Sequence, residues 1–193
     1  MKILLLDNYD SFTYNLVHLA EQFDGVEVSV QRNNEFRVED AHHFDKILLS
    51  PGPGLPDDAG VLKRLIREMA GKKSIFGVCL GMQAIAEVFG GTLFNLEKVQ
   101  HGIATLTTVI DPSEILYKDL PLQFKSGRYH SWMVKKENLP GCFQITSVDS
   151  NQQIMSLRHK EFDICGVQFH PESVLTEFGK EMMGNWINAD LKR

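Results

Sequence analysis

The first half of the chain alternates short apolar runs with amphipathic segments, and this alternation constrains the fold more than any other feature. Four runs have the length and composition of buried strands: residues 2–6 (KILLL), 26–31 (VEVSVQ), 46–50 (KILLS) and 74–78 (SIFGV). Three segments between them have helical spacing of apolar residues: 16–23, 57–70 and 80–89. The alternation predicts an α/β fold with an open, mostly parallel twisted sheet and helices on both faces.

The second half of the chain has a different pattern. From about residue 92 onward the sequence is rich in β-forming residues, and a helical segment from Thr176 to Ala189 closes it. The strand-like runs there are 103–110, 143–148, 153–159 and 164–169. No repeat, low-complexity tract or linker separates the halves. We therefore expect residues 1–193 to form a single domain with a β-rich C-terminal half.

Composition excludes several functional classes. The 193 residues are 43% hydrophobic, enough for one substantial core. The net charge is -5 and the 20 basic residues are scattered, which argues against a nucleic-acid surface. No apolar run approaches the ~20 residues that a membrane span needs. The three cysteines are widely spaced, which is typical of a reducing compartment, so we expect a cytoplasmic protein without disulfides.

Cys79 lies at a corner of the predicted fold, between the apolar run 74–78 and the helical segment 80–89. Gly77 and Gly81 flank it, so the pattern is G-x-C-x-G, which is typical of a nucleophile elbow. A thiol at a helix N-terminus also feels the partial positive charge of unpaired N–H groups, which favours the thiolate. The alternative is that Cys79 is a small buried apolar residue, as most free cysteines are.

A second candidate for function is the turn SPGPG at residues 50–54, which follows the apolar run 46–49. Its glycines and prolines leave a stiff turn with few side chains, so that backbone N–H groups can face a ligand. Beside an elbow, this turn can supply one donor of an oxyanion hole, and the N–H of Leu80 can supply the other. By itself the motif is equally consistent with an ordinary surface turn.

The third candidate is QFHPES at residues 168–173. Pro171 restricts His170 to extended geometry, so the side chains of His170 and Glu172 are expected to project to the same side. A carboxylate in that position can orient the imidazole. Together with Cys79, the two residues supply a nucleophile, a base and an orienting group. The remaining histidines lack a comparable setting: His18, His42, His43, His101, His130 and His159.

These motifs resemble a known family. GVCLGMQ (77–83), SPGPG (50–54), YHS (129–131) and VQFHPES (167–173), with the opening LLLDNYDSFTYN, are similar to class I glutamine amidotransferases, and specifically to the small glutaminase subunits of anthranilate synthase and aminodeoxychorismate synthase. The resemblance implies hydrolysis of L-glutamine and delivery of ammonia to a chorismate-using large subunit. Tryptophan biosynthesis through anthranilate is the first expectation, and folate biosynthesis through aminodeoxychorismate is the alternative.

The resemblance also implies a role for each matching residue. Cys79 would be the nucleophile that forms a thioester, His170 the general base and acid, and Glu172 the residue that holds the imidazole. Glutamine binding and the oxyanion hole would fall to a larger set: Gly52, Pro53, Gly54, Leu80, Gln83, Ser131 and Trp132. No cofactor is implied, and the sequence offers no ligand cluster for a metal.

Two positions depart from the common pattern of the family. Met82 stands where many relatives have histidine, and Trp132 where many have leucine. Neither side chain is needed for the chemistry, so these departures concern the shape of the glutamine pocket. Outside the pocket, Tyr9, Phe12 and Tyr14 crowd onto one turn, and aromatic residues are enriched at interfaces. We expect this turn to face the partner subunit.

Three other functions are compatible with parts of the sequence. A freestanding cysteine hydrolase of γ-glutamyl compounds would share the elbow and the histidine. A binding module that has lost catalysis would keep the fold, but the presence of Cys79, His170 and Glu172 argues against it. A flavodoxin-like nucleotide-binding protein is the third, and against it no G-x-G-x-x-G or Walker loop follows the first apolar run.

Overall fold

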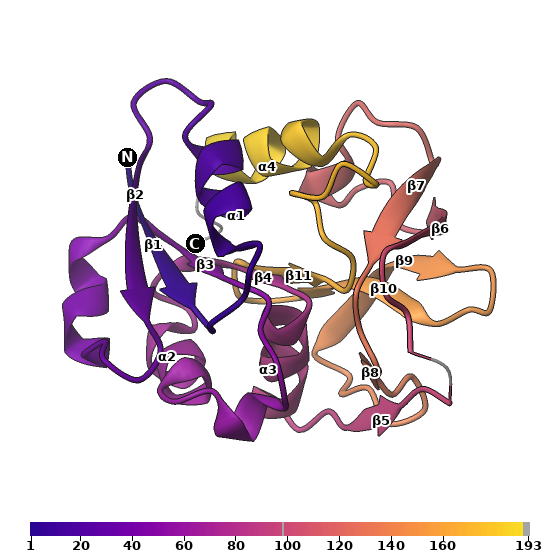
Figure 1. Cartoon of the computed structure of the whole chain (residues 1–193), viewed down its shortest axis with the longest axis horizontal. Helices are drawn as coiled ribbons and strands as arrows, with labels where there is room; N and C mark the ends of the chain where they lie inside the picture. Colours follow the sequence, from indigo (N-terminus) through magenta and orange to yellow (C-terminus); the bar gives the residue numbers. More distant parts are fainter. Residues whose placement is uncertain (98, 191–193) are drawn as a thin grey trace.

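The computed structural model describes residues 1–97 and 99–190, and its centre is a nine-stranded sheet (Figure 1). The strands, in the order of the sheet, are β2 (Glu27–Arg32), β1 (Lys2–Asp7), β3 (Lys46–Leu49), β4 (Ser74–Val78), β11 (Ile164–Val167), β10 (Ile154–His159), β9 (Phe143–Asp149), β6 (Ile103–Val109) and β7 (Gln123–Arg128). A separate antiparallel pair consists of β5 (Leu93–Asn95) and β8 (Trp132–Val134).

The sheet changes character at β11. Strands β2, β1, β3, β4 and β11 pair in parallel, whereas β10, β9, β6 and β7 continue the sheet by antiparallel pairing. The predicted α/β fold with a β-rich second half is therefore confirmed. Strand β11 comes late in the chain but pairs with β4 in a register that sets Val167 opposite Val78. The residues that follow these two strands, Cys79 and Gln168, are thus neighbours at one edge of the sheet.

Helices cover both faces of the parallel half (Figure 1). On one face lie α1 (Thr13–Ala20) and α4 (Gly179–Asn188), and on the other lie α2 (Leu62–Met69) and α3 (Leu80–Val88). Side chains of β1 alternate between the two cores: Ile3 and Leu5 pack with α1 and α4, while Leu4 and Leu6 pack with α2 and α3. Burial on both faces explains why β1, β3, β4 and β11 read as continuous apolar runs, unlike the half-exposed edge strand β2.

The structure shifts several predicted boundaries. Residues 57–70 divide into the 3-10 helix η2 (Pro56–Asp58) and α2, because Gly60 between them has a φ of +52°. The last helix begins at Gly179, three residues after the predicted start, because Phe178 has a left-handed φ of 61°. Two other 3-10 helices, η1 (Val38–His43) and η3 (Ile115–Tyr117), and the strands β5, β7 and β8 were not predicted.

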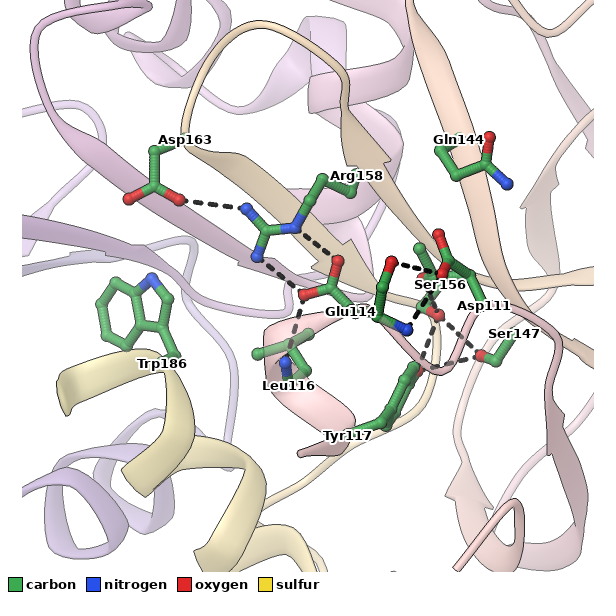
Figure 2. A network of polar contacts seen from close by, with 12 residues as sticks. Asp111, Glu114, Leu116, Tyr117, Gln144, Ser147, Ser156, Arg158, Asp163 and Trp186 are labelled. Carbon is green, nitrogen blue, oxygen red and sulfur yellow. Dashed lines mark hydrogen bonds and ion pairs between the residues drawn. The ribbon is translucent and has the colours of Figure 1, made fainter. Parts of the chain in front are cut away.

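A buried ionic cluster, here called the Arg158 cluster, lies at the end of β10 (Figure 2). It consists of Arg158, Glu114 and Asp163. The guanidinium of Arg158 donates to both carboxylate oxygens of Glu114, at 2.7 Å for the Nη2 contact, and to Asp163 Oδ1 at 3.0 Å. Glu114 also accepts the backbone N–H of Leu116 at 3.2 Å, which caps η3. The cluster therefore ties the segment before η3 to the sheet.

Among the residues that the structure describes, no helix combines the length and the apolar character that crossing a membrane requires.

Candidate active site

Cys79 connects β4 directly to α3 and has a backbone conformation that residues other than glycine rarely adopt. Its φ of 51° and ψ of -103° place it at positive φ, where an L-residue is strained. The corner is nevertheless fixed at both ends, because the Cys79 N–H donates to the carbonyl of Val167 at 2.8 Å and its carbonyl accepts the N–H of Gln83 at 3.0 Å. The structure thus confirms the predicted strand-to-helix corner, and its strain is of the kind found at functional sites.

The glycines on either side of Cys79 allow this corner to pack closely. A Cβ at Gly77 would lie 2.5 Å from the backbone of Gly81, and a Cβ at Gly81 would lie 2.7 Å from the carbonyl oxygen of Leu49. Neither position can carry a side chain without moving α3 away from β3 and β4. The prediction that the flanking glycines make room for close strand–helix packing is confirmed.

His170 and Glu172 form a buried pair just beyond β11. His170 Nδ1 lies 2.7 Å from Glu172 Oε1, as the prediction of a common side requires, and the Glu172 side chain has no exposed surface. The loop that carries them is held by its backbone: the His170 N–H donates to the carbonyl of Gly127 at 3.1 Å, and the hydroxyl of Thr176 donates to the carbonyl of His170 at 2.5 Å. The imidazole therefore has a fixed position and a fixed orientation.

The electrostatics of His170 favour its charged form. Burial lowers the pKa of His170, but its interactions with Cys79 and Glu172 outweigh this effect and raise the pKa to about 10. His170 Nε2 and Glu172 Oε2 are buried, and the structure gives neither atom a hydrogen-bond partner within the described residues. A buried nitrogen without a partner, close enough to Cys79 to interact with it, can exchange a proton with a group that reacts at the sulfur.

Aromatic rings enclose His170. The ring centroids of Phe12 and Tyr129 lie 5.7 Å and 4.9 Å from that of His170, and 5.0 Å from each other. Of the three aromatics expected to face a partner, Phe12 therefore packs against the site, whereas Tyr9 and Tyr14 are 47% and 63% exposed. Tyr129 was not predicted as a site residue, although it belongs to the YHS motif that carried the family resemblance.

A cavity of about 320 Å³ opens beside Cys79. This volume is at the small end of the range for ligand sites and suits a ligand of amino-acid size. Its lining comprises Gly52, Pro53, Gly54, Cys79, Gln83, Tyr129, His130, Ser131 and Trp132. Six of the seven residues expected to bind glutamine therefore surround one cavity that also contains Cys79. The seventh, Leu80, is buried next to Cys79 and is not part of the lining.

Buried hydrogen bonds hold the turn at residues 50–54 against the first strand. Asn8 donates its backbone N–H to Ser50 Oγ at 2.8 Å and its side-chain amide to the Ser50 carbonyl at 2.9 Å. Asn33 in turn donates to Asn8 Oδ1 at 3.0 Å. Neither asparagine was predicted as a site residue, because their contacts come from strands that are distant in the chain. The turn is therefore a rigid wall of the cavity.

The structure changes the interpretation of Met82 and of His130. Met82 is fully buried, and its side chain fills the space over Gly166, where a Cβ would lie 2.7 Å from Met82 Cγ. It belongs to the core and not to the cavity. His130, set aside in the sequence analysis, lines the cavity, and neither ring nitrogen has a hydrogen-bond partner among the described residues. Burial, with Arg128 and His170 nearby, lowers the pKa of His130 to about 3.

Gln83 and Gln168 connect the cavity wall to the sulfur. Gln83 Nε2 lies 2.8 Å from the backbone oxygen of Trp132 and 3.2 Å from Gln168 Oε1. Gln168 Nε2 lies 3.5 Å from Cys79 Sγ. Gln168 was not among the predicted site residues, although it stands in the same motif as His170. The described residues include no group of three or more His, Cys, Asp or Glu side chains placed to hold a metal ion.

Comparisons with known proteins show which family the chain is similar to. The model of the family Glutamine amidotransferase class-I matches residues 4–189. The aminodeoxychorismate/anthranilate synthase component 2 of Bacillus subtilis is 44% identical over 189 residues, which are 97% of this chain and 96% of that protein. The aminodeoxychorismate synthase component 2 of Escherichia coli is 41% identical and covers 96% of this chain and 99% of its own length.

A solved structure has the same fold. The crystal structure of a glutamine amidotransferase from Thermotoga maritima matches 97% of this chain and 80% of its own chain, with a TM-score of 0.73 and 16% identity. At that identity the likeness concerns the fold alone. The match of the family model and the identity to curated relatives over nearly the whole length lead to one conclusion: the chain belongs to the class I glutamine amidotransferase family.

Proposed function

We propose that this chain is the glutaminase subunit of a chorismate-using synthase. In this proposal residues 1–193 act as one amidotransferase domain that hydrolyses L-glutamine and passes ammonia to a large partner subunit. The observation that carries the proposal is the strained Cys79 corner, which opens into a cavity of amino-acid size and interacts with the buried His170–Glu172 pair. The names of the relatives, each a component 2 of such a synthase, support the choice of partner.

The first half of the reaction forms a thioester. The Cys79 thiolate attacks the γ-carboxamide carbon of glutamine, so that a C–S bond forms and the carbonyl electron pair moves onto oxygen. The N–H of Leu80 and the backbone of the turn 52–54 stabilise this oxyanion. His170 then gives its Nε2 proton to the amide nitrogen as the C–N bond breaks. Ammonia leaves, and a γ-glutamyl thioester remains on Cys79.

The second half of the reaction restores the enzyme. His170, now neutral, takes a proton from water at Nε2 while the water oxygen attacks the thioester carbon. The C–S bond breaks, and Cys79 leaves as a thiolate beside a protonated His170. Glutamate is released. Glu172 accepts the Nδ1–H of His170 in both halves, and it stabilises the imidazolium each time the ring gains a proton.

Substrate binding falls to the rest of the cavity. Gln83, Ser131 and Trp132 are proposed to hold the amino-acid end of glutamine, and Gly52 to Gly54 to hold the carboxamide end near Cys79. Tyr9 and Tyr14, which are exposed, are proposed to contact the partner. Phe12 lies on the same turn and packs against His170, so a partner bound there can influence the position of the imidazole. We therefore expect the partner to raise glutaminase turnover.

The pathway is the finer part of the proposal. Anthranilate synthesis is proposed first and aminodeoxychorismate synthesis as the alternative, and one glutaminase can serve both. Purification of the chain with its native partner, followed by identification of the large subunit, distinguishes the two. Recovery of no chorismate-using subunit, together with equal glutaminase rates for the free chain and in the presence of either synthase, would instead indicate a freestanding hydrolase.

The decisive test of the chemistry is Cys79→Ser in the assembled synthase. We expect glutamine-dependent product formation to be abolished, because serine lacks the acidic thiol. Product formation from added ammonium should persist, because the partner carries out that step. Loss of both activities in a folded complex would contradict the proposed division of labour, and retention of glutamine-dependent activity would contradict the role of Cys79.

A further inference from the structure

We propose that Gln168 stabilises the Cys79 thiolate with a side-chain N–H, and that the backbone carbonyl of Trp132 enforces this orientation through Gln83. The inference rests on the proposed role of Cys79 as the nucleophile. It assigns a function to a residue that neither the elbow nor the His170–Glu172 pair requires.

The orientation of the two amides follows from one fixed acceptor. A backbone carbonyl can only accept, so the Gln83 atom that lies 2.8 Å from the Trp132 oxygen must be the nitrogen. The second N–H of that nitrogen points at Gln168, so the Gln168 atom 3.2 Å away must be its oxygen. The nitrogen of Gln168 is then the atom that faces Cys79 Sγ at 3.5 Å. An N–H donor is thereby directed at the sulfur.

The amide pair is also held rigidly. Gln168 has no exposed surface and Gln83 is 3% exposed, so water does not compete effectively for their hydrogen bonds. Gln168 is the first residue after the last β11–β4 pair, and its backbone N–H donates to the carbonyl of Met155 at 2.8 Å. Gln83 lies in the first turn of α3, and its backbone N–H donates to the carbonyl of Cys79. Both amides are therefore fixed to the same corner as the sulfur.

A directed N–H matters because the sulfur changes its charge. A hydrogen bond to the charged form of an acid favours that form, and donors to an ionised acceptor are roughly twice as strong as donors to a neutral one. Gln168 thus favours the thiolate without supplying a charge or a proton. His170, two residues further on, supplies both. Since Gln83 and Trp132 line the cavity, a ligand that moves either of them also alters the donor at the sulfur.

The experiment measures the alkylation of Cys79 by iodoacetamide as a function of pH, on the full chain with Cys142→Ser as the background. Cys79 lines the cavity, whereas Cys165 is 1% exposed and lies within β11, so the signal reports Cys79. Gln168→Met keeps the size of the side chain and removes the N–H. We expect it to raise the apparent thiol pKa by about one unit, which slows alkylation about tenfold at pH values below that pKa.

Gln168→Glu separates this role from a merely structural one. Glutamate keeps an oxygen that can accept from Gln83, so a residue that only supports Gln83 would tolerate glutamate better than methionine. The proposed role predicts the reverse, because glutamate replaces the donor with a carboxylate that repels the thiolate. An unchanged alkylation profile in the methionine variant, or a milder effect of glutamate than of methionine, would overturn the inference.

Two further variants keep the test decisive. Gln83→Met frees the Gln168 amide without altering it, so it should raise the thiol pKa by less than Gln168→Met; it carries the test if the Gln168 variants fail to fold. Asn185→Leu is the matched control, because this amide donates to the carbonyls of Leu116 and Lys118 and not to Cys79. The alkylation readout needs no glutaminase activity. If the pH profile of alkylation is the same in Gln168→Met as in the wild type, only the role of Gln168 is contradicted. If the wild-type complex shows no glutaminase activity, only the proposed function is contradicted.

Discussion

Two clusters of buried ionisable groups lie at opposite ends of β11, and they are built differently. At the start of the strand, the guanidinium of Arg158 meets two carboxylates, and both oxygens of Glu114 are bonded to it (Figure 2). Asp163 Oδ1 is bonded to it as well, and Asp163 Oδ2 is the one carboxylate oxygen of this cluster without a partner among the described residues. Beyond its end, the imidazole of His170 has one hydrogen bond, to Glu172, while His170 Nε2 and Glu172 Oε2 have no partner among the described residues. The strained Cys79 lies beside this second cluster.

The difference separates structural from reactive polar groups. Buried ion pairs with good geometry fix the relative positions of chain segments, and breaking one leaves an uncompensated charge. Buried atoms without partners are rare, so each one requires an explanation. For His170 Nε2, which lies beside the strained Cys79, a reacting ligand can supply it, whereas Asp163 Oδ2 belongs to a carboxylate that is already paired with Arg158. Cavity size does not make this distinction, because the cavity beside Arg158 is larger, at about 540 Å³, than the cavity of about 320 Å³ beside Cys79.

Among substitutions in the two clusters, the largest expected effect comes from His170→Gln, which removes the proton carrier of the proposed reaction. Glutamine-dependent turnover of the complex should fall about 10³–10⁴-fold, the upper part of the range for acid–base catalysis. The thermal midpoint should also fall, because glutamine leaves the buried Glu172 carboxylate without its cationic partner, so turnover is compared per folded complex. Steady-state assays with glutamine and with ammonium, together with thermal unfolding, make the comparison.

The matched control for that variant is His159→Gln at the other end of β11. His159 Nδ1 accepts the backbone N–H groups of Glu161 and Phe162, and its ring packs against Phe89, Phe143 and Phe162, which are not residues of the proposed site. We expect lower stability and normal turnover. If His159→Gln reduced turnover as much as His170→Gln, the division between a structural and a reactive cluster would be wrong.

The next effect is on folding. Glu114→Ala leaves Arg158 without its main partner and should lower the free energy of unfolding by about 3–5 kcal/mol, the usual cost of breaking a buried ion pair. Urea denaturation measures this value. The double variant Glu114→Ala with Arg158→Met should be more stable than Glu114→Ala alone, since it removes the unpaired charge. Turnover per folded complex should match the wild type in both, and reduced turnover would connect the cluster to catalysis.

The residues beyond the end of β11 could be predicted from the sequence, whereas the Arg158 cluster at its start could not. Cys79, His170 and Glu172 stand in short motifs whose spacing reflects local geometry, and the structure places them as that spacing requires. The Arg158 cluster joins residues 44 positions apart, and no local pattern signals such a pair. His130, Gln168 and Asn8 were missed for the same reason, because their contacts depend on which strands become neighbours. Strands β5, β7 and β8 were missed because tertiary pairing, and not local propensity, defines them.

Glu172→Gln should have a smaller effect than His170→Gln. Loss of a hydrogen bond to a charged group corresponds to about 1.5–3 kcal/mol, so kcat should fall about 10–100-fold with little change in KM. Because Glu172 helps to raise the pKa of His170, the pKa of His170 should also fall, and NMR titration of the imidazole measures this. Combined with His170→Gln, the substitution should add almost nothing. An unchanged kcat would leave Cys79 and His170 as a dyad.

The same pair predicts a pH dependence of stability. His170 has a pKa of about 10 in the folded protein, above the value near 6.5 of an unfolded histidine. The stabilisation from its charged form is therefore complete below pH ~6.5 and is lost as the pH rises towards about 10. Glu172→Gln should flatten this decline. If the wild-type free energy of unfolding stayed constant or rose between pH ~6.5 and about 10, the assignment would be contradicted.

The smallest effects are expected at the two cysteines outside the site. Cys165 lies within β11, between the two clusters, and its burial raises the pKa of its thiol, so it stays protonated and unreactive. Cys165→Ser should cost about 1–3 kcal/mol of stability through a buried hydroxyl, with normal turnover. Cys142→Ser, at a half-buried position, should change stability by about 0.5 kcal/mol or less. Loss of glutaminase activity in Cys165→Ser without loss of stability would mean that β11 transmits changes between its ends. The two clusters would then be parts of one functional unit.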